Sequence, residues 1–508
     1  MPTCRMLTVA ALVLLPTASF AQTKDITLDA TERFMKTALA AAKDTPMPRL
    51  REDSQVFTML RATRDPAVLP VFVKLAQSNA PENQAYAYVA SATITKDSAK
   101  ANLAAILQMN DAGLVGTAIS ALMDADLLNE QQLMTIATTA NDPAHRVMAA
   151  GELNRKGKLA NRELLTGLLK ANKDIVRYFA AISLLETKDA AEVQAALATL
   201  RELTAKNDAK AAPIQALMFS RIAKFNIAAA APWVESISAD EKADEDLRRA
   251  GVVTLLSLKR TEGARLYGAM VQSQREIGDQ IKLALIGIEF AEQIKPATFE
   301  PIEKSRSTLA KSLGVIARQA AEGNDINGAL VRQMREGHPL VLDWALIYAD
   351  RAEPERRRVL RQAIISQATV VDGVRGKDFE RAVIATQRLL EEATKPDRAI
   401  VAELLKSPNR AVVEAVVAGA MRSNATNLSE LILPHWEALS KTAATEAAAN
   451  YAAIVLAREG RQESLAWLSG MVQGGTVQTI GFRVIAGWYY AKLQNQHEDM
   501  LKRVLAGS

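Results

Sequence analysis

The chain has few of the residues that build thiol, disulfide or zinc sites. Cys4 is the only cysteine among 508 residues, which excludes a disulfide scaffold. The four histidines are at least 60 residues apart, so the paired spacing of a zinc site on one helix is absent. They are His145, His338, His435 and His497.

Residues that break helices or favour strands are also scarce. The 24 glycines and 17 prolines make up about 8% of the chain, against an average of roughly 12%, and aromatic residues make up 5%. Alanine, the best helix former, is abundant. This composition predicts an all-α protein. A formal net charge of +5 is too small to favour nucleic-acid binding.

The N-terminus has the pattern of a secretory signal. Arg5 is the only charged residue among the first 23, and the apolar run from Met6 to Leu15 is too short to cross a bilayer. Residues 19–21, Ser-Phe-Ala, have the small-x-small pattern of a cleavage site, so residues 1–21 are predicted to be removed. A buried N-terminal helix is the alternative. We expect a protein exported to a bacterial periplasm, without cysteine and without a transmembrane segment.

Beyond this leader, small and apolar residues recur at a fixed period. One series consists of Ala87, Ala118, Ala149 and Ala180, each 31 residues after the last. A second series, offset by about half a period, consists of Leu75, Ile106, Ala137 and Leu168. Two phased series predict two segments in each repeat. Local apolar spacing within the segments is that of amphipathic helices.

Helix-start residues fit the same repeat. Asp142 is placed to cap a helix whose first residue is Pro143, and Asp174 has the corresponding place one repeat later. A leading helix is expected over residues 27–43.

The repeat continues at looser spacing and divides the chain. Small residues return 34 residues apart at Ala418, Ala452 and Ala486, but the period blurs between Pro296 and Arg375. We therefore predict an N-terminal array over residues 22–295, an irregular segment, hinge or site over 296–375, and a C-terminal array over 376–508. Helix pairs that cannot bury their apolar faces alone are expected to stack into an α-solenoid, a single elongated spine. Unrelated helical bundles with coincidental spacing are the alternative.

Two of these segments resemble the first helix of HEAT-like repeats, particularly the short repeats of phycobilisome-lyase-type proteins. That pattern reads Asp-Pro-x-x-Val-Arg-x-x-Ala-Ala-x-x-Leu. It is matched by Asp142, Pro143, Arg146, Ala149, Ala150 and Leu153, and by Asp174, Val176, Arg177, Ala180, Ala181 and Leu184. The clear match covers residues 53–203 and implies a HEAT-like superhelix without implying lyase activity. It also implies that Arg146 and Arg177 pair with acidic or carbonyl groups of neighbouring repeats; a ligand site at these arginines is the alternative.

Catalytic motifs are missing from the sequence. Neither a nucleophile elbow nor a phosphate-binding glycine loop is present. The densest carboxylate cluster, at Asp240, Glu241, Asp244, Glu245 and Asp246, precedes a helix expected near Leu247, where acids stabilise the helix start. General-acid chemistry or calcium binding by this cluster is the alternative. We expect no enzyme activity, metal or cofactor.

Four of the five tryptophans lie after residue 340, at Trp344, Trp436, Trp467 and Trp488. We expect them to fill the core of the last repeats; a groove for sugars or peptides is the alternative.

The sequence therefore favours a non-catalytic scaffold that binds a protein or peptide of the cell envelope. Candidate contact residues on the second helices are Lys74, Gln77, Gln108, Gln131, Arg162 and Lys170. A basic run of Arg356, Arg357 and Arg358 is a candidate docking patch for an anionic partner. The alternative function is a cell-wall polysaccharide-acting enzyme, or its accessory subunit, with a superhelical α-domain.

Overall fold

A computed structural model describes residues 25–159, 161–187, 189–204, 212–324, 326–336, 340–371, 374–392, 394–441, 446–474 and 479–507. The predicted signal sequence and His338 lie outside these residues.

The fold is all-α. The first stretch consists of α1 (Ile26–Ala42), η1 (Met47–Arg49), α2 (Asp53–Thr63), η2 (Pro66–Val68), α3 (Leu69–Leu75), α4 (Pro81–Ile94), α5 (Ser98–Leu107), α6 (Ala112–Asp124), α7 (Glu130–Thr139), α8 (Pro143–Arg155), α9 (Glu163–Leu168), α10 (Asp174–Leu184), α11 (Ala190–Thr204), α12 (Ala212–Lys224), η3 (Ala228–Ala230) and α13 (Ala231–Ala239). The middle stretch consists of α14 (Glu245–Ser257), α15 (Thr261–Ser273), α16 (Ile277–Glu289), η4 (Ala291–Gln293), η5 (Pro296–Phe299), α17 (Glu300–Glu303), α18 (Thr308–Ala321), α19 (Ile326–Glu336), α20 (Val341–Arg351) and α21 (Pro354–Ile365). Two short antiparallel strands follow, β1 (Val370–Val371) and β2 (Val374–Arg375). The last stretch consists of α22 (Lys377–Glu392), α23 (Lys395–Leu404), α24 (Arg410–Arg422), α25 (Ser429–Ser440), α26 (Glu446–Arg458), η7 (Gln462–Ser464), α27 (Leu465–Gln473), α28 (Ile480–Leu493) and α29 (His497–Ala506).

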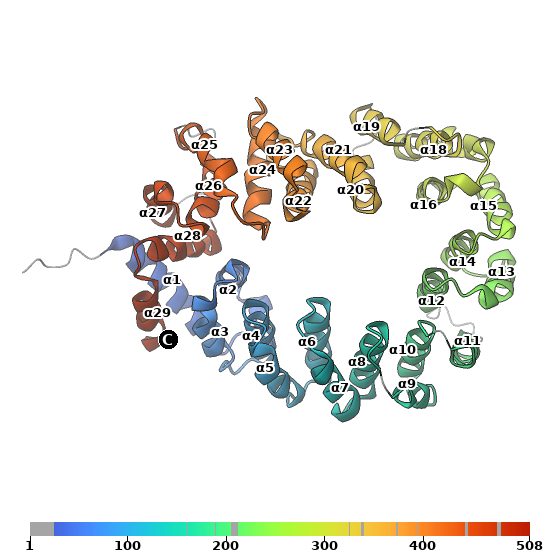
Figure 1. Ribbon diagram of the computed structural model, residues 1–508, viewed down its shortest axis with the longest axis horizontal. Helices are drawn as coiled ribbons and strands as arrows, with labels where there is room; N and C mark the ends of the chain where they lie inside the picture. The colour runs from blue at the N-terminus through green and yellow to red at the C-terminus, as the bar shows by residue number, and fades with distance from the viewer. Residues whose placement is uncertain are drawn as a thin grey trace, which may run out of the picture.

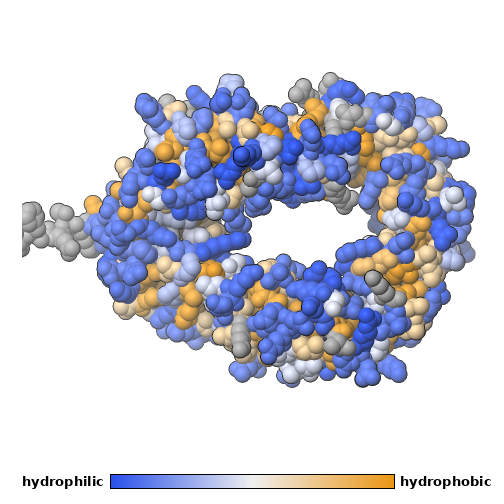
Figure 2. All heavy atoms as spheres, in the orientation of Figure 1, coloured by the Kyte–Doolittle hydropathy of each residue, from blue (hydrophilic) through white to orange (hydrophobic). Residues whose placement is uncertain are grey.

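These helices follow one another around a closed ring with a central opening (Figure 1). Neighbouring first helices of the pairs pack on each other, as α8 does on α10, α12 on α14, and α22 on α24. Hydrophilic residues border the upper and lower edges of the opening (Figure 2).

The two 31-residue series lie on the two helices of each pair. The alanines Ala87, Ala118, Ala149 and Ala180 are buried on α4, α6, α8 and α10, nearer the opening (Figure 1). The second series lies on α3, α5, α7 and α9, on the outer side (Figure 1). Small side chains at the first series allow adjacent helix backbones to approach closely. The predicted paired-helix period is therefore confirmed for this part of the chain.

The two predicted helix caps have different outcomes. Asp142 caps α8 by accepting a hydrogen bond from the Ala144 N–H (2.9 Å), with Pro143 at the first helical position. The prediction for Asp174 is wrong by one residue, because extended Lys173 precedes the helix and Asp174 is its first residue. The predicted leading helix is confirmed as α1.

The first and last helices close the ring. Helix α1 packs on α27, α28 and α29, and α2 packs on α28. A shared apolar core contains Met35 and Phe57 from one end of the chain with Trp488 and Met500 from the other. The expected single elongated spine is therefore closed into a ring. The ring closes because each helix pair is rotated slightly relative to the pair before it. No local sequence pattern specifies the sum of these rotations.

Polar contacts reinforce this closure. Asp65 accepts hydrogen bonds from Lys492 Nζ (2.6 Å) and Trp488 Nε1 (3.2 Å), and Glu32 accepts one from Arg503 Nε (2.5 Å). Burial raises the pKa of the Asp65 carboxyl, but the hydrogen bonds from Lys492, from the Ala67 N–H and from Trp488 outweigh burial and hold that pKa below its ordinary value. The ionised form of Asp65 therefore stabilises the junction of the two chain ends.

The two arginines of the HEAT-like pattern differ in their contacts. Arg177 donates through Nε to the Leu169 carbonyl (3.1 Å) and through Nη2 to Glu202 (2.7 Å), which confirms the pairing implied for it. Arg146 has a buried Nε for which no described residue provides a hydrogen-bond acceptor. The implied ladder is therefore present at one of the two positions.

Candidate functional site

A cavity of about 910 Å³ lies in the wall of the ring, where the end of the predicted N-terminal array meets the segment in which the sequence period blurs. Its lining comes from α16, η4, the end of α18, the start of α19, α20 and α21. Figure 1 places α16 and α20 next to the central opening. We call it the wall cavity; its volume falls in the range of about 300–1,000 Å³ that is usual for ligand pockets.

Helix α20 gives the wall cavity an apolar and aromatic side. Trp344, Ile347 and Tyr348 are spaced i, i+3 and i+4, so they share one helix face, and all three line the cavity. The Trp344 and Tyr348 rings are stacked, with centroids 5.1 Å apart and planes 22° apart. Ile347 is 55% exposed.

Ion pairs on both sides hold α20 in place. Asp343 accepts hydrogen bonds from Arg381 of α22, at 2.5 Å from Nε and 2.6 Å from Nη2. Asp350 accepts one from buried Arg361 of α21 (3.1 Å). A hydrogen bond from Asp343 raises the pKa of the Arg381 guanidinium, so this arginine stays charged. The aromatic face is therefore presented by a helix fixed to its two neighbours.

The facing side of the wall cavity carries carboxylates. Glu289 ends α16 and Glu292 lies in η4; both are exposed residues of the lining. Tyr267 of α15 donates a hydrogen bond to the Leu283 carbonyl (2.7 Å), which joins α15 to α16. Gly323, two residues after the end of α18, lines the cavity, and its φ of +75° suits a glycine.

The lining combines apolar, aromatic, amide and charged side chains. Its polar side chains are those of Glu289, Glu292, Gln293, Asn324, Tyr348 and Arg356. Among the described residues of the lining, none is a serine, cysteine, histidine or lysine. In the part of the chain that the structure describes, no group of acidic, histidine or cysteine side chains is placed to hold a metal ion.

The three arginines of the predicted basic run on α21 have different surroundings in the fold. Arg356 is exposed and lines the wall cavity. Arg357 donates to the Ala352 carbonyl (2.9 Å) and to Glu392 (2.9 Å), while Arg358 lies 3.9 Å from Asp397. Of the three, Arg356 is thus the one that the structure brings to the cavity.

The other predicted contact residues are spread along the outer helices, and the structure gathers them into no single site. Lys74 and Gln77 line a small cavity of about 160 Å³ beside α1. Gln108 follows α5 and Gln131 lies on α7, both exposed. Arg162 pairs with Glu192 (2.5 Å).

Lys170 lies near Arg162 along the chain, in an open depression between α9 and α11. Arg177 and Glu202 line the same depression. Exposed small residues form much of its floor, and no further feature there indicates a ligand.

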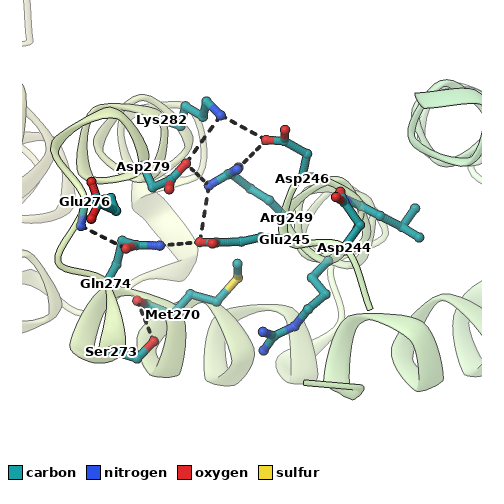
Figure 3. Close-up of polar contacts among 12 residues, drawn as sticks. Asp244, Glu245, Asp246, Arg249, Met270, Ser273, Gln274, Glu276, Asp279 and Lys282 are labelled. Atoms are coloured by element: carbon teal, nitrogen blue, oxygen red, sulfur yellow. Dashed lines mark hydrogen bonds and ion pairs between the residues drawn. The ribbon is translucent and has the colours of Figure 1, made fainter. Parts of the chain in front are cut away.

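The acidic cluster lies at the start of α14, and side chains there contact α16 (Figure 3). Asp244 caps α14 by accepting a hydrogen bond from the Leu247 N–H (3.0 Å), and the helix begins at Glu245, two residues before the expected start near Leu247. Asp246 accepts hydrogen bonds from Lys282 Nζ (2.9 Å) and from Arg249, which also donates to Asp279 (2.9 Å). The hydrogen bonds from Lys282 and Arg249 lower the pKa of Asp246. This network joins α14 to α16.

The tryptophans take different places. Trp488 is fully buried, as predicted for the core, and Trp436 and Trp467 are half-buried in edge contact with each other. Trp344 lines the wall cavity, which the core interpretation missed. The available signal was the i, i+3, i+4 spacing of Trp344, Ile347 and Tyr348 within the irregular segment.

No family model matches the chain, and no curated protein matches it. Among the described residues, no helix is both long enough and apolar enough to cross a bilayer.

Proposed function

We propose that this chain is a non-catalytic binding protein that holds a protein or peptide partner, with the wall cavity as its anchoring site. The observation that carries the proposal is the face of α20 that presents Trp344, Ile347 and Tyr348 to a cavity of about 910 Å³. Tryptophan and tyrosine are enriched among the few interface residues that dominate binding free energy, and ligand sites are concave and mostly apolar.

The composition of the lining favours a polypeptide partner. Aliphatic side chains, including those of Leu285, Ile286 and Ile288, lie beside the aromatic pair and suit large apolar side chains. Amide and carboxylate groups lie in the same lining and can satisfy the hydrogen-bonding groups of a peptide backbone.

The wider proposal is a HEAT-like repeat scaffold that works outside the cytoplasm, in a bacterial periplasm. The paired-helix period, the cap at Asp142 and the contacts of Arg177 support the repeat assignment. The leader at residues 1–21 supports export.

Selection from a random peptide library tests the function. We expect selected peptides to share a large apolar residue, and Trp344→Ala and Ile347→Ser to weaken their binding by about tenfold or more. Val73→Ser on α3 is the matched control, because Val73 is equally exposed at 55% and lies outside the cavity lining. Failure to enrich any peptide, or equal binding by the α20 variants and wild type, would contradict the proposal.

A second candidate function, that of a cell-wall polysaccharide-acting enzyme or its accessory subunit, has one observation in its favour. Trp344 lies in the same lining as Glu289, Gln293 and Asn324, and aromatic rings with amides and carboxylates also suit sugars. A muramidase assay and a glycan-binding titration test it; turnover above background, lost in Glu289→Gln, would favour this candidate over the first.

A further inference from the structure

We propose that Arg146 of α8 binds a carboxylate group, and that an acidic side chain of the partner polypeptide supplies this group. The carboxylate takes the place beside Arg146 that Glu202 has beside Arg177, one repeat later. The polypeptide source of the carboxylate rests on the proposed function. The site itself does not, because Arg146 is not among the residues that line the wall cavity.

Three arginines on the first helices of other pairs have acidic partners from two places. In each case one partner lies three residues earlier on the same helix, and another lies on a different helix. The pairs are Arg177 with Asp174 and Glu202, Arg249 with Asp246 and Asp279, and Arg381 with Asp378 and Asp343. Pro143 stands three residues before Arg146, and Ala171 stands 31 residues before Glu202. Neither side chain carries a charge, so Arg146 has no acid at either place.

No other contact replaces these partners among the described residues. Arg146 is half-buried, its Nε is buried without a hydrogen-bond acceptor, and its side chain has no ion pair in that part of the chain. The other charged side chains with an unpaired buried atom of this kind each keep an ion pair. They are Glu303, Arg318, Arg361, Asp397 and Glu414. A cation partly removed from water without a counter-charge is unfavourable, and a bound anion relieves that cost.

The geometry of a guanidinium favours a carboxylate as that anion. Its N–H groups form a planar fork, which matches the two oxygens of a carboxylate with two parallel hydrogen bonds. Arg177 uses one edge of this fork, donating from Nε to the Leu169 carbonyl (3.1 Å) and from Nη2 to Glu202 (2.7 Å). At Arg146 the Nε remains for a ligand. A glutamate or aspartate of a partner can therefore bind there with one oxygen at the buried Nε.

Anion titration of the purified protein tests the site directly. Proton–nitrogen spectra of the arginine Nε–H groups are recorded while acetate replaces chloride at constant ionic strength, and Arg146→Gln identifies the Arg146 signal by its loss. We expect that signal to shift with a Kd on the order of 10–100 mM, because acetate makes a single contact. The signal of Arg33, an exposed arginine of α1, is the control and should stay in place. An Arg146 signal that moves no more than that of Arg33 overturns the inference.

Supplying the carboxylate within the chain is a second test. Pro143→Asp places an acid three residues before Arg146, as Asp174 stands before Arg177. The new aspartate should compete with acetate and weaken its binding by about threefold or more, whereas Pro143→Asn should leave it unchanged. Equal acetate binding by the two variants contradicts the site. Melting curves check that all variants fold.

Three further ligands distinguish the source of the anion. A capped Gly/Ser peptide with one central glutamate, its glutamine counterpart and inorganic phosphate are titrated in the same way. We expect the glutamate peptide to shift the Arg146 signal at least as strongly as acetate does, and the glutamine peptide to leave it in place. A stronger response to phosphate than to either carboxylate overturns the assignment to an acidic side chain.

The failure of this inference and the failure of the proposed function are distinguishable. Acetate binding reports on Arg146 without any peptide, so an unresponsive Arg146 leaves peptide binding at the wall cavity standing. Failure to select any peptide, with acetate still bound at Arg146, overturns the proposed function and leaves the carboxylate site in place.

Discussion

Gly487→Ala tests the closure of the ring at its closest helix contact. Gly487 of α28 faces Thr31 of α1, and an added Cβ would overlap Thr31 Oγ1 and lie 2.8 Å from both its Cβ and its Cγ2. Thr31 is fully buried, and its hydroxyl donates to the Thr27 carbonyl (2.8 Å). Rotating the threonine cannot remove the overlap with its Cβ, so α1 and α28 must separate.

Two opposing effects set the magnitude. Alanine in place of a helical glycine stabilises a helix by about 1 kcal/mol, whereas overpacking a buried contact costs about 1–3 kcal/mol. Because the overlap involves a Cβ atom, we expect the cost to dominate, with a net loss of about 1–2 kcal/mol. Gly470→Ala on α27 is the control, since a Cβ there meets no atom within 4 Å, and it should stabilise by about 0.5–1 kcal/mol.

The assay combines denaturant unfolding with a distance measurement across the junction. Spin labels on cysteines introduced at Thr37 of α1 and Glu498 of α29 report the separation, with Cys4, the only natural cysteine, replaced if it is retained. Gly487→Ala should lengthen or broaden the distance distribution, and Thr31→Gly should restore it. If Gly487→Ala matches Gly470→Ala in both stability and distance, the described closure is refuted.

Three further predictions concern stability. Asp65→Asn should lower the melting temperature at pH 7. Because the pKa of Asp65 is lowered in the folded chain, the difference from wild type should begin to shrink as the pH falls through the ordinary aspartate pKa of about 4, and vanish only below the lowered folded-state pKa, where the carboxyl is protonated in both states. Ala180→Trp should cost about 3 kcal/mol in chemical unfolding by overpacking a fully buried position, whereas Ala104→Trp at an exposed site of α5 should cost little; equal effects would contradict the assigned interface. Arg249→Met should cost about 1–2 kcal/mol, since a nearly buried cation between two helices is lost while its acidic partners remain partly solvated; no loss of stability would show that the network in Figure 3 is dispensable.

The helix pairs could be predicted because their signal is local and repeated. Ala87, Ala118, Ala149 and Ala180 occupy equivalent buried positions, so one period in the sequence corresponds to one repeat in space. The cap at Asp142 followed from adjacent residues alone, whereas the assignment of Asp174 failed by one position, because the start of a helix depends on the preceding backbone.

The closure and the wall cavity could not be predicted in the same way. Contact between Asp65 and Lys492 requires the sum of many small rotations along the ring, and no residue near either position encodes that sum. Trp344 and Trp488 are alike as residue types, yet one lines a cavity and the other is fully buried. Their difference depends on which neighbouring helix covers each face, which becomes known only when the ring is assembled.

The junction between α1 and α28 also restricts how any molecule could come to occupy the central opening (Figure 1). With the junction intact, the opening has no lateral exit, so a long polymer would have to thread through it end-first. The ring could encircle a covalently circular polymer only after α1 and α28 separate. Linear and circularised forms of one ligand would then differ in how fast they associate, although they offer the same chemical groups.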